Sequence, residues 1–484
     1  MRFGSELAIP GVQFDNNIVE AGSSQVELRV SAAGPVTAKS FWLGAGDALS
    51  HAKGGKGMTN FDRRSFLRVG SLSVFGYLGW GDALRVRAES PAPASKDLSI
   101  IHLWLAGGMS QLDTFDPKPD ADDRYRGQFK PIATKVAGIR VSEHLPGTAQ
   151  LADKYVIIRS MTHKQAAHEA ACNLILSGHD PLPTIQHPAV QTVIAKELGP
   201  RNEMPAVISI PGATGSWEKS GFLGPQFNPF NAGNPNSNKF KVRDMDLPMG
   251  VDWARMDHRR SLLSVVDEKF RVLDTTGISA SMDAYYQTAF GLMHSAKAKK
   301  AFEISEEPDE LREKYGRTSL GQGALLARRL VENGVRFVTV SRGFNTWDHH
   351  KDIFPALAND FLPELDQAFA SLVEDLDQRG MLASTLVIVT GEFGRTPEIN
   401  AMGGRDHWPN AFSLALAGAG ITGGRALGET DEKGMFVKDH PVEVPDLVAT
   451  IYKKLGIDYN KEYVSNIGRS IKLSQGKPVE FLMV

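Results

Sequence analysis

The feature that most constrains the fold is a set of six short segments in which nearly every residue is apolar or β-branched. Strands that are buried on both faces have this pattern, and such strands are typical of parallel sheets covered by helices on both sides. In chain order, the expected strands span residues 98–105, 155–158, 206–210, 335–340, 385–389 and 412–416.

Segments with helical periodicity separate these expected strands. The expected helices span residues 188–198, 259–273, 282–302, 320–333, 361–378 and 445–455, and several of them end at a glycine. Alternating strands and helices predict a single α/β domain over residues 98–484, with a doubly wound, mostly parallel sheet sandwiched by helices. Residues 211–238 are rich in Gly, Asn and Pro and are expected to form a long loop.

Composition excludes several classes of protein. The formal net charge of −2 over 484 residues offers no basic field for nucleic acid, and no stretch approaches the roughly 20 apolar residues of a stable membrane span. The one cysteine, Cys172, excludes an internal disulfide and a cysteine-based zinc site. Any metal must therefore be held by His, Asp, Glu, Asn or Gln side chains.

An export signal is predicted over residues 58–88. Arg63 and Arg64 precede Phe66 and Leu67, and a short apolar run broken by glycines follows, which is similar to a twin-arginine signal. A basic turn before a buried helix is the alternative. The signal implies the twin-arginine translocation machinery as a partner and a periplasmic or extracellular location. Cleavage after Ala88 would remove ten Lys/Arg and seven Asp/Glu, leaving 44 against 49 and a net charge of −5.

Such a signal is expected close to the start of a chain, yet 57 residues precede Met58. Residues 53–57 would be encoded by a purine-rich run that resembles a bacterial ribosome-binding site. We therefore interpret residues 1–57 as an upstream extension and Met58 as the start of translation. A genuine extension with a separate role is the alternative.

N-terminal sequencing tests both expectations. The precursor should begin at Met58 and the exported chain at Glu89, directly after the predicted cleavage site. A precursor that begins at Met1 would contradict the expected start, and an exported chain that retains Arg63 and Arg64 would contradict the expected cleavage.

Candidate ligands for a metal ion follow the expected strands. The first strand is followed by Gly107-Gly108 and then Asp113, and the second is followed by His163 and His168. Asp348 and His350 follow a later strand and are two residues apart, so in an extended turn their side chains point to the same side. Carboxylate and imidazole ligands suit zinc, manganese or iron.

A last group of polar residues follows the strand expected at 385–389. Glu392 and Arg395 come first, and Arg405, Asp406 and His407 follow within sixteen residues. Arginine side chains bind phosphate, sulfate or carboxylate in a bidentate manner. Salt bridges within the group are the alternative to an anion site. Because ligands of α/β sheets gather at the carboxyl ends of the strands, we expect these side chains to share one site.

The motifs resemble the bacterial family called domain of unknown function 1501. The resemblance covers about residues 98–455 and rests on the runs 107–119, 347–350, 391–397, 404–409 and 428–431, followed by residues 441–442 and 449–450. It implies an alkaline phosphatase-like α/β fold and a divalent metal ion, which could be zinc, manganese, calcium or iron. It also implies metal-dependent hydrolysis of sulfate or phosphate esters, with a small molecule or a polysaccharide as substrate.

Three positions depart from the pattern of the sulfatase superfamily. His168 stands where the resemblance places a Cys, Ser or Thr nucleophile, Gly107-Gly108 replace an acidic pair, and Glu392-Phe393 replace an Asp-His pair. His168 is accordingly predicted to be either the nucleophile or a metal ligand, and Arg395 or Arg405 to neutralise the ester oxygens. The predicted metal ligands are Asp113, His163, Asp348, His350, Glu392, Asp406 and His407.

Two further functions remain open at this point. A noncatalytic protein that binds an anion or a sulfated polysaccharide could use the same fold, because the acidic pair and the hydroxyl nucleophile are absent. A redox or other metalloenzyme is the third possibility.

Overall fold

The computed structural model describes residues 97–242, 251–259, 261–262 and 290–483. The predicted extension (1–57) and the predicted signal (58–88) lie outside the described residues, as do most of the helix expected at 259–273 and much of that expected at 282–302. Residues Pro91–Val484 belong to one compact unit. Within the described ranges, no helix combines the length and the apolar character that crossing a membrane requires.

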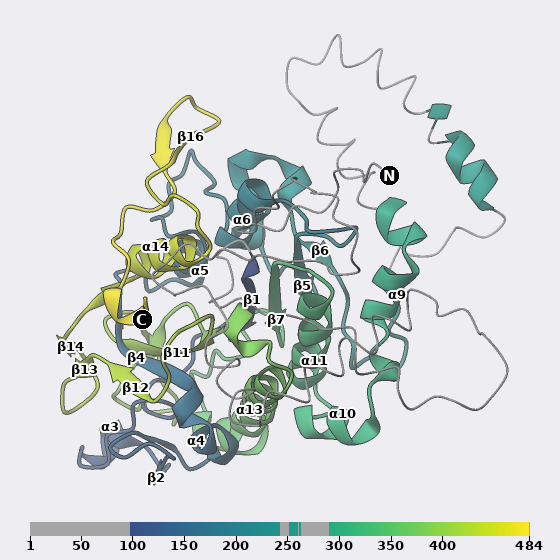
Figure 1. The fold of residues 1–484 in the computed structure, drawn as a ribbon. Helices are drawn as coiled ribbons and strands as arrows, with labels where there is room; N and C mark the ends of the chain where they lie inside the picture. The colour runs from purple at the N-terminus through teal and green to yellow at the C-terminus, as the bar shows by residue number, and fades with distance from the viewer. Residues whose placement is uncertain (1–96, 243–250, 260, 263–289, 484) are drawn as a thin grey trace, which may run out of the picture. The chain divides into compact units, whose positions relative to one another are not determined.

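A nine-stranded sheet forms the centre of this unit (Figure 1). Eight of its strands follow the order β12-β4-β11-β8-β1-β7-β5-β6, and β15 also pairs with β4. Their bounds are β1 Ser99–Trp104, β4 Tyr155–Thr162, β5 Val207–Ile210, β6 Phe230–Asn231, β7 Phe337–Ser341, β8 Thr385–Thr390, β11 Phe412–Gly418, β12 Arg425–Leu427 and β15 Val442–Glu443. All six strands expected from the sequence are present.

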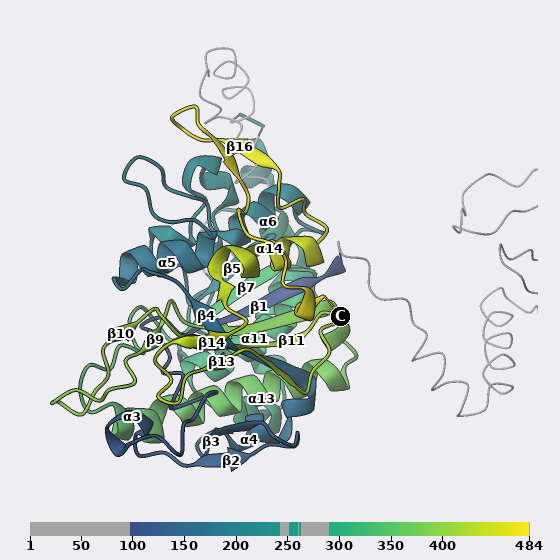
Figure 2. The ribbon, with the colours of Figure 1, turned by 90° about the vertical axis from the view of Figure 1, so that its left-hand side faces the viewer.

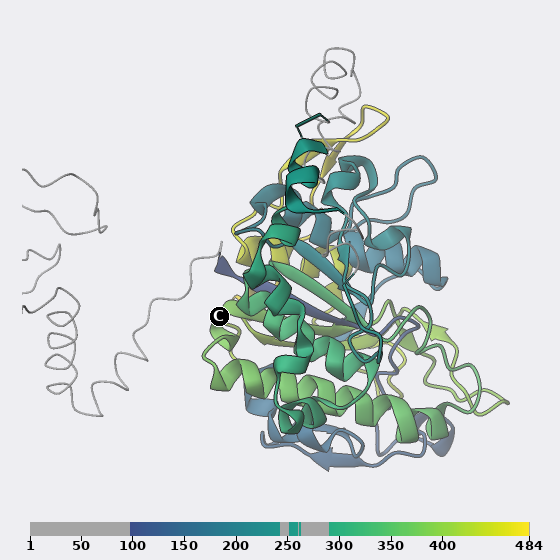
Figure 3. The same ribbon diagram turned by 90° about the vertical axis from the view of Figure 1, so that its right-hand side faces the viewer.

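Helices cover both faces of the sheet. One layer contains α11 (Ser319–Glu332) and α13 (Leu362–Gln378), the green helices on one side of the sheet in Figure 3. The other contains α5 (His168–Ser177), α6 (Val190–Leu198) and α14 (Val444–Lys454), which Figure 2 shows on the opposite face. The fold class predicted from the sequence, a helix-covered, mostly parallel sheet, is therefore confirmed.

The alternation of side chains along β1 shows why both layers form. Ile101 and Leu103 belong to the core under α11 and α13, whereas Ile100 and Trp104 belong to the core under α5, α6 and α14. All four side chains are at most 1% exposed. Successive side chains of a strand point to opposite faces, so an apolar strand stabilises two cores. Each fully buried side chain of this size contributes roughly 1.5–3 kcal/mol.

Strand β11 is the exception to the parallel arrangement, because it pairs antiparallel with both β4 and β8. Between β8 and β11 the chain forms the hairpin of β9 (Gly394–Arg395) and β10 (His407–Trp408). Parallel neighbours need a crossover connection that returns the chain to the other end of the sheet. The hairpin stays at the end where β8 finishes, so β11 runs back in the opposite direction.

Short elements complete the unit. Further helices are α3 Asp123–Arg126, α4 Pro146–Gln150, α9 Ala296–Phe302, α10 Asp309–Tyr315, α12 Ile353–Ala356 and the π-helix Leu357–Phe361. The remaining strands are β2 Pro131–Ala133, β3 Arg140–Ser142, β13 Glu429–Thr430, β14 Val437–Asp439, β16 Glu462–Val464 and β17 Ser470–Lys472.

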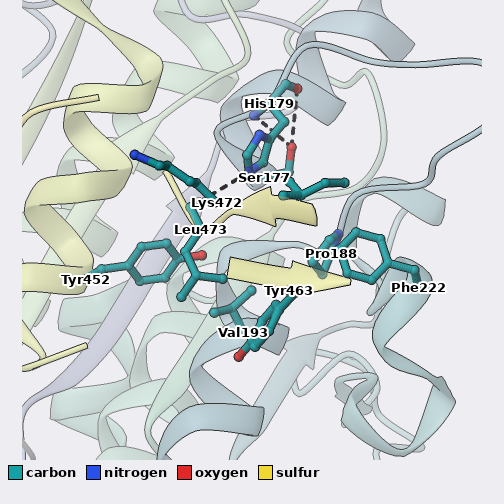
Figure 4. Close-up of a pocket in the computed structure, with 10 residues that line it drawn as sticks. Ser177, His179, Pro188, Val193, Phe222, Tyr452, Tyr463, Lys472 and Leu473 are labelled. Carbon is teal, nitrogen blue, oxygen red and sulfur yellow. Dashed lines mark hydrogen bonds between the residues drawn. The ribbon is translucent and has the colours of Figure 1, made fainter. Parts of the chain in front are cut away.

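The hairpin of β16 and β17 packs near the end of α5 (Figure 4). A small cavity of about 10 Å³ lies there among His179, Tyr452, Tyr463 and Leu473. This volume holds one water molecule. The His179 ring contacts the backbone carbonyl of Leu473 with Nε2 at 3.2 Å, and this contact links the C-terminal segment to the end of α5.

Gly107 lies where the backbone after β1 meets the backbone of the loop after β7. Its φ is +116°, and a Cβ atom at this position would lie 2.5 Å from the backbone nitrogen of Asp348. The amide of Trp347 also donates to the carbonyl of Ala106 at 3.0 Å. Both the positive φ and the close approach require glycine. The loop that carries Asp348 is thus packed directly on the end of β1.

Replacement of Gly107 by alanine should destabilise the protein more than replacement of Gly138. Gly138 also has a positive φ, +84°, but no atom lies within 4 Å of the Cβ position. Gly138→Ala should therefore cost only the backbone strain, about 1 kcal/mol, and Gly107→Ala at least about 2 kcal/mol more, because backbone atoms must move. Urea denaturation of both variants measures the difference. Equal losses in the free energy of unfolding would show that the loop carrying Asp348 can move away from residue 107 without destabilising the protein.

Candidate metal centre

Four side chains meet at the carboxyl ends of β1, β7 and β8. Asp348 and His350 come from the loop after β7, His168 is the first residue of α5, and His407 is the first residue of β10. In Figure 2, α5 and the hairpin of β9 and β10 lie on the same side of the unit. The potential ligand atoms of His168, Asp348 and His407 all lie within 4.8 Å of one another.

The three imidazole rings direct Nε2 towards the Asp348 carboxylate. The distances are 3.2 Å for His168, 2.9 Å for His350 and 3.2 Å for His407. The Nε2 atoms of His350 and His407 are also 3.0 Å apart. Ligand atoms around a tetrahedral zinc ion are about 3.3 Å apart, as bond lengths of about 2.0–2.1 Å require. The observed separations are close to this value.

Each of the three rings is held through Nδ1 by a hydrogen-bond acceptor. Nδ1 of His168 lies 2.7 Å from Oε1 of Glu392, and Nδ1 of His350 lies 2.6 Å from Oδ1 of Asp406. Nδ1 of His407 lies 2.7 Å from the carbonyl oxygen of Ala166. Histidine ligands of metals are oriented in this way by carboxylates and carbonyls around the site.

These contacts determine which ring nitrogens carry protons. The carbonyl oxygen of Ala166 can only accept a hydrogen bond, so Nδ1 of His407 must carry the proton. The Asp406 carboxylate is also an acceptor, so Nδ1 of His350 must carry a proton as well. In the neutral rings both Nε2 atoms then carry lone pairs, and these face each other at 3.0 Å. Two lone pairs at this distance require a cation between or beside them, either a proton or a metal ion. His168, Asp348 and His407, whose ligand atoms all lie within 4.8 Å of one another, fit a divalent transition metal, and His350 contacts two of these three residues.

The charges around the cluster favour a cation. Burial opposes protonation of His168, but the hydrogen bonds of its ring with Asp348 and Glu392 outweigh burial and raise its pKa to about 9. Burial also opposes ionisation of Asp348, yet the hydrogen bonds that it accepts from His168 and from the guanidinium of Arg395 hold its pKa well below the usual range. The site is open to solvent on one side, because the His350 side chain is 39% exposed.

Glu392 and Asp406 contact the Nδ1 atoms of His168 and His350, on the side of each ring that faces away from Asp348. Both carboxylate oxygens of Glu392 accept a hydrogen bond from the backbone N–H of Gly107, at 2.9 and 3.0 Å, and the Glu392 side chain is fully buried. Asp406 is held by the amide of Asn400, which also donates to the carbonyl of His350. The structure therefore brings both carboxylates to the site as partners of His168 and His350.

His163 and Asp113 lie outside the four-residue cluster. Nε2 of His163 is 2.7 Å from the carbonyl oxygen of Glu392, so the ring supports the backbone at that residue. Asp113 is fully buried and accepts from Nε of Arg405 at 2.8 Å and from the hydroxyl of Ser110 at 2.5 Å. The Asp113 carboxylate is paired with a guanidinium, so it does not face the imidazoles.

The two arginines expected to bind an ester are buried. The guanidinium of Arg405 donates to Asp113 and to the carbonyls of Tyr125, Thr396 and Pro397. Arg395 donates to the carbonyls of Gly107, Gly108 and Arg405 and contacts Oδ1 of Asp348 at 2.5 Å. Both side chains are fully buried, so these contacts hold the strand-end loops together.

Some contributors to the site could not be recognised from the sequence. The backbone N–H of Gly107 and the carbonyl of Ala166 have no side-chain signal. Phe393 stacks on the ring of His407, with centroids 4.5 Å apart and planes at 28°, and its place beside Glu392 was the only hint of this role. Asn400 could have been found from its position between Glu392 and the Arg405-Asp406-His407 run.

Comparison with solved structures finds distant likenesses. A sulfatase, PsFucS1 from Pseudoalteromonas sp., is 10% identical over 74% of this chain and 68% of its own, with a TM-score of 0.33. The lipoteichoic acid synthase LtaP from Listeria monocytogenes is 10% identical over 80% and 76%, with a TM-score of 0.33. The phosphonate monoester hydrolase SpPMH from Silicibacter pomeroyi is 12% identical over 80% and 76%, also with a TM-score of 0.33.

Likenesses at this level say nothing about what this chain binds or transforms. A search of curated proteins found no match. A family model, by contrast, matches residues 97–483, which include all of the described residues and therefore every residue of the candidate centre. The chain belongs to the DUF1501 family, whose description is a protein of unknown function.

Proposed function

We propose that the chain is an exported, metal-dependent hydrolase of phosphate or sulfate esters. The observation that carries this proposal is the convergence of three imidazole Nε2 atoms on Asp348, each ring being fixed through Nδ1 by an acceptor. A bound divalent ion would polarise an ester oxygen and lower the pKa of bound water. His168, Asp348, His350 and His407 would hold the ion.

Zinc, manganese or iron suits this donor set better than calcium. Calcium takes six to eight oxygen ligands, whereas three of the four donors here are nitrogens. Calcium, which the family resemblance also implies, therefore suits this centre less well than the other three ions.

The residues around the centre have supporting roles in this proposal. Arg395 positions the Asp348 carboxylate, and Glu392 and Asp406 orient the rings of His168 and His350. Both nitrogens of His168 face carboxylates, which favours a ligand role for this residue over that of nucleophile, with water as the attacking group. The start of α5 can receive an anionic substrate, because Ala167 caps the helix without a side-chain hydrogen bond.

The alternative proposal is a protein that binds an anion without catalysis. The burial of Arg395 and Arg405 counts against catalysis, because neither guanidinium is free to stabilise ester oxygens in a transition state, and a bound anion would then be held by the start of α5. Cys172 is also buried, and burial raises the pKa of its thiol, so it offers no nucleophile.

Metal binding is the first test. The metal-stripped protein should take up one equivalent of Zn²⁺ in calorimetric titration. His407→Ala removes a ligand and should weaken binding at least about 100-fold, and Glu392→Gln should weaken it about 10- to 100-fold, because it acts through His168. His440→Ala is the matched control, since the side chain of this histidine is 71% exposed and, within the described residues, pairs with neighbouring Asp439 alone. Uptake that is equal in all four proteins would contradict the proposed centre.

Hydrolysis is the second test. The metal-loaded protein should cleave at least one of p-nitrophenyl phosphate, bis(p-nitrophenyl) phosphate and p-nitrophenyl sulfate. His407→Ala should lower kcat/KM at least about 100-fold, because a lost ligand removes the bound ion, whereas His440→Ala should not change it. Full metal uptake without turnover on any of these esters would favour the noncatalytic alternative.

A further inference from the structure

A second cavity lies at the same edge of the sheet, at the carboxyl ends of β7 and β6. Its volume is about 390 Å³, which is within the range of small-molecule sites. Polar and charged side chains dominate its lining. The members used below are Asn236, Arg342, Asn359, Asp360, Glu364 and Gln367.

Several of these side chains face solvent and have no partner within the described part of the protein. Among the described residues, none forms a hydrogen bond or ion pair with the side chains of Asn236, Asn359, Asp360 or Gln367. Each carboxamide offers two N–H donors and a carbonyl acceptor. A ligand that presents donors and acceptors together, as hydroxyl groups do, can satisfy all of these groups at once.

One ion pair lies at the cavity wall. Nη1 of Arg342 lies 3.1 Å from Oε2 of Glu364, and the guanidinium lies over the ring of Phe361 at 4.1 Å. The other oxygen of Glu364 accepts from the backbone N–H of Leu320 at 3.0 Å. Because Glu364 compensates Arg342, Asp360 leaves the lining with a net negative charge. An anionic ligand would be repelled, so the charges favour an uncharged one.

The backbone at the cavity is unusual. Asn359 and Asp360 belong to the π-helix Leu357–Phe361, which lies between α12 and α13. Short π-helical segments are rare and frequently occur at functional sites. Phe361, the last residue of this turn, contacts the rings of Trp347 and His349 with centroids 5.1 and 4.5 Å apart. The cavity therefore adjoins the loop that carries Asp348.

We propose that this cavity binds an uncharged, hydroxyl-rich ligand of mono- or disaccharide size. The free carboxamides and Asp360 would bind its hydroxyl groups, and the ion pair of Arg342 and Glu364 would orient it. The site does not depend on hydrolysis at the metal centre.

The test uses the exported chain with glucose, galactose and lactose as probes. Saturation-transfer NMR and calorimetry should detect saturable, millimolar binding of at least one probe. Asn359→Ala and Gln367→Ala should each weaken that binding at least about fivefold. Asn460→Ala, an exposed asparagine outside the cavity, is the matched control and should leave binding unchanged. Thermal unfolding of each variant separates loss of the site from loss of the fold.

Two further measurements locate the bound sugar. His350→Ala, at the metal centre, should retain sugar binding, and inorganic sulfate should not compete with the sugar. The proposal is overturned if no probe binds saturably below about 50 mM, if both cavity variants bind as the wild type does, or if His350→Ala or sulfate abolishes binding. The last result would place the sugar at the metal centre.

Discussion

The contact between Arg395 and Asp348 is the interaction on which the candidate centre depends. The Asp348 carboxylate lies among three imidazole nitrogens, and Arg395 fixes it from the buried side at 2.5 Å. The same guanidinium is bonded to the carbonyls of Gly107, Gly108 and Arg405. One fully buried side chain thus joins the loops after β1, β7 and β8. Loss of one partner of a buried ion pair leaves an uncompensated charge, at a cost of about 3–5 kcal/mol.

The hydrogen-bond acceptors of the three Nδ1 atoms determine the orientation of the imidazole rings at the centre. Glu392, Asp406 and the carbonyl of Ala166 each hold one Nδ1, and each thereby leaves Nε2 as the atom that faces Asp348. They come from the loop after β8, the β9–β10 hairpin and the turn before α5. All three rings thus present a nitrogen to the same carboxylate, which is the arrangement that a bound divalent cation would use.

Much of the fold could be predicted because burial on both faces leaves a clear pattern in β1, β4, β5, β7, β8 and β11. The antiparallel direction of β11 could not be predicted, because a buried strand has the same apolar pattern in either direction. At the site, the spacing of Asp348 and His350 was informative because the loop is local. The ion pair of Asp113 with Arg405 could not be predicted, because the two residues are far apart in the sequence. Without knowledge of that partner, Asp113 has the features of a metal ligand.

Gly107-Gly108 explains why carboxylates have different positions here from those that the family resemblance implies. An acidic pair at the end of β1 would need space that the backbone of Trp347 and Asp348 occupies, 2.5–2.8 Å from the Cβ position of Gly107. With that space filled, β1 contributes a backbone N–H, which binds Glu392. Glu392 in turn holds His168 and does not face the centre of the cluster. If the centre binds a metal ion, as we propose, this close packing of two backbones would favour nitrogen over oxygen donors, and zinc-like ions over calcium.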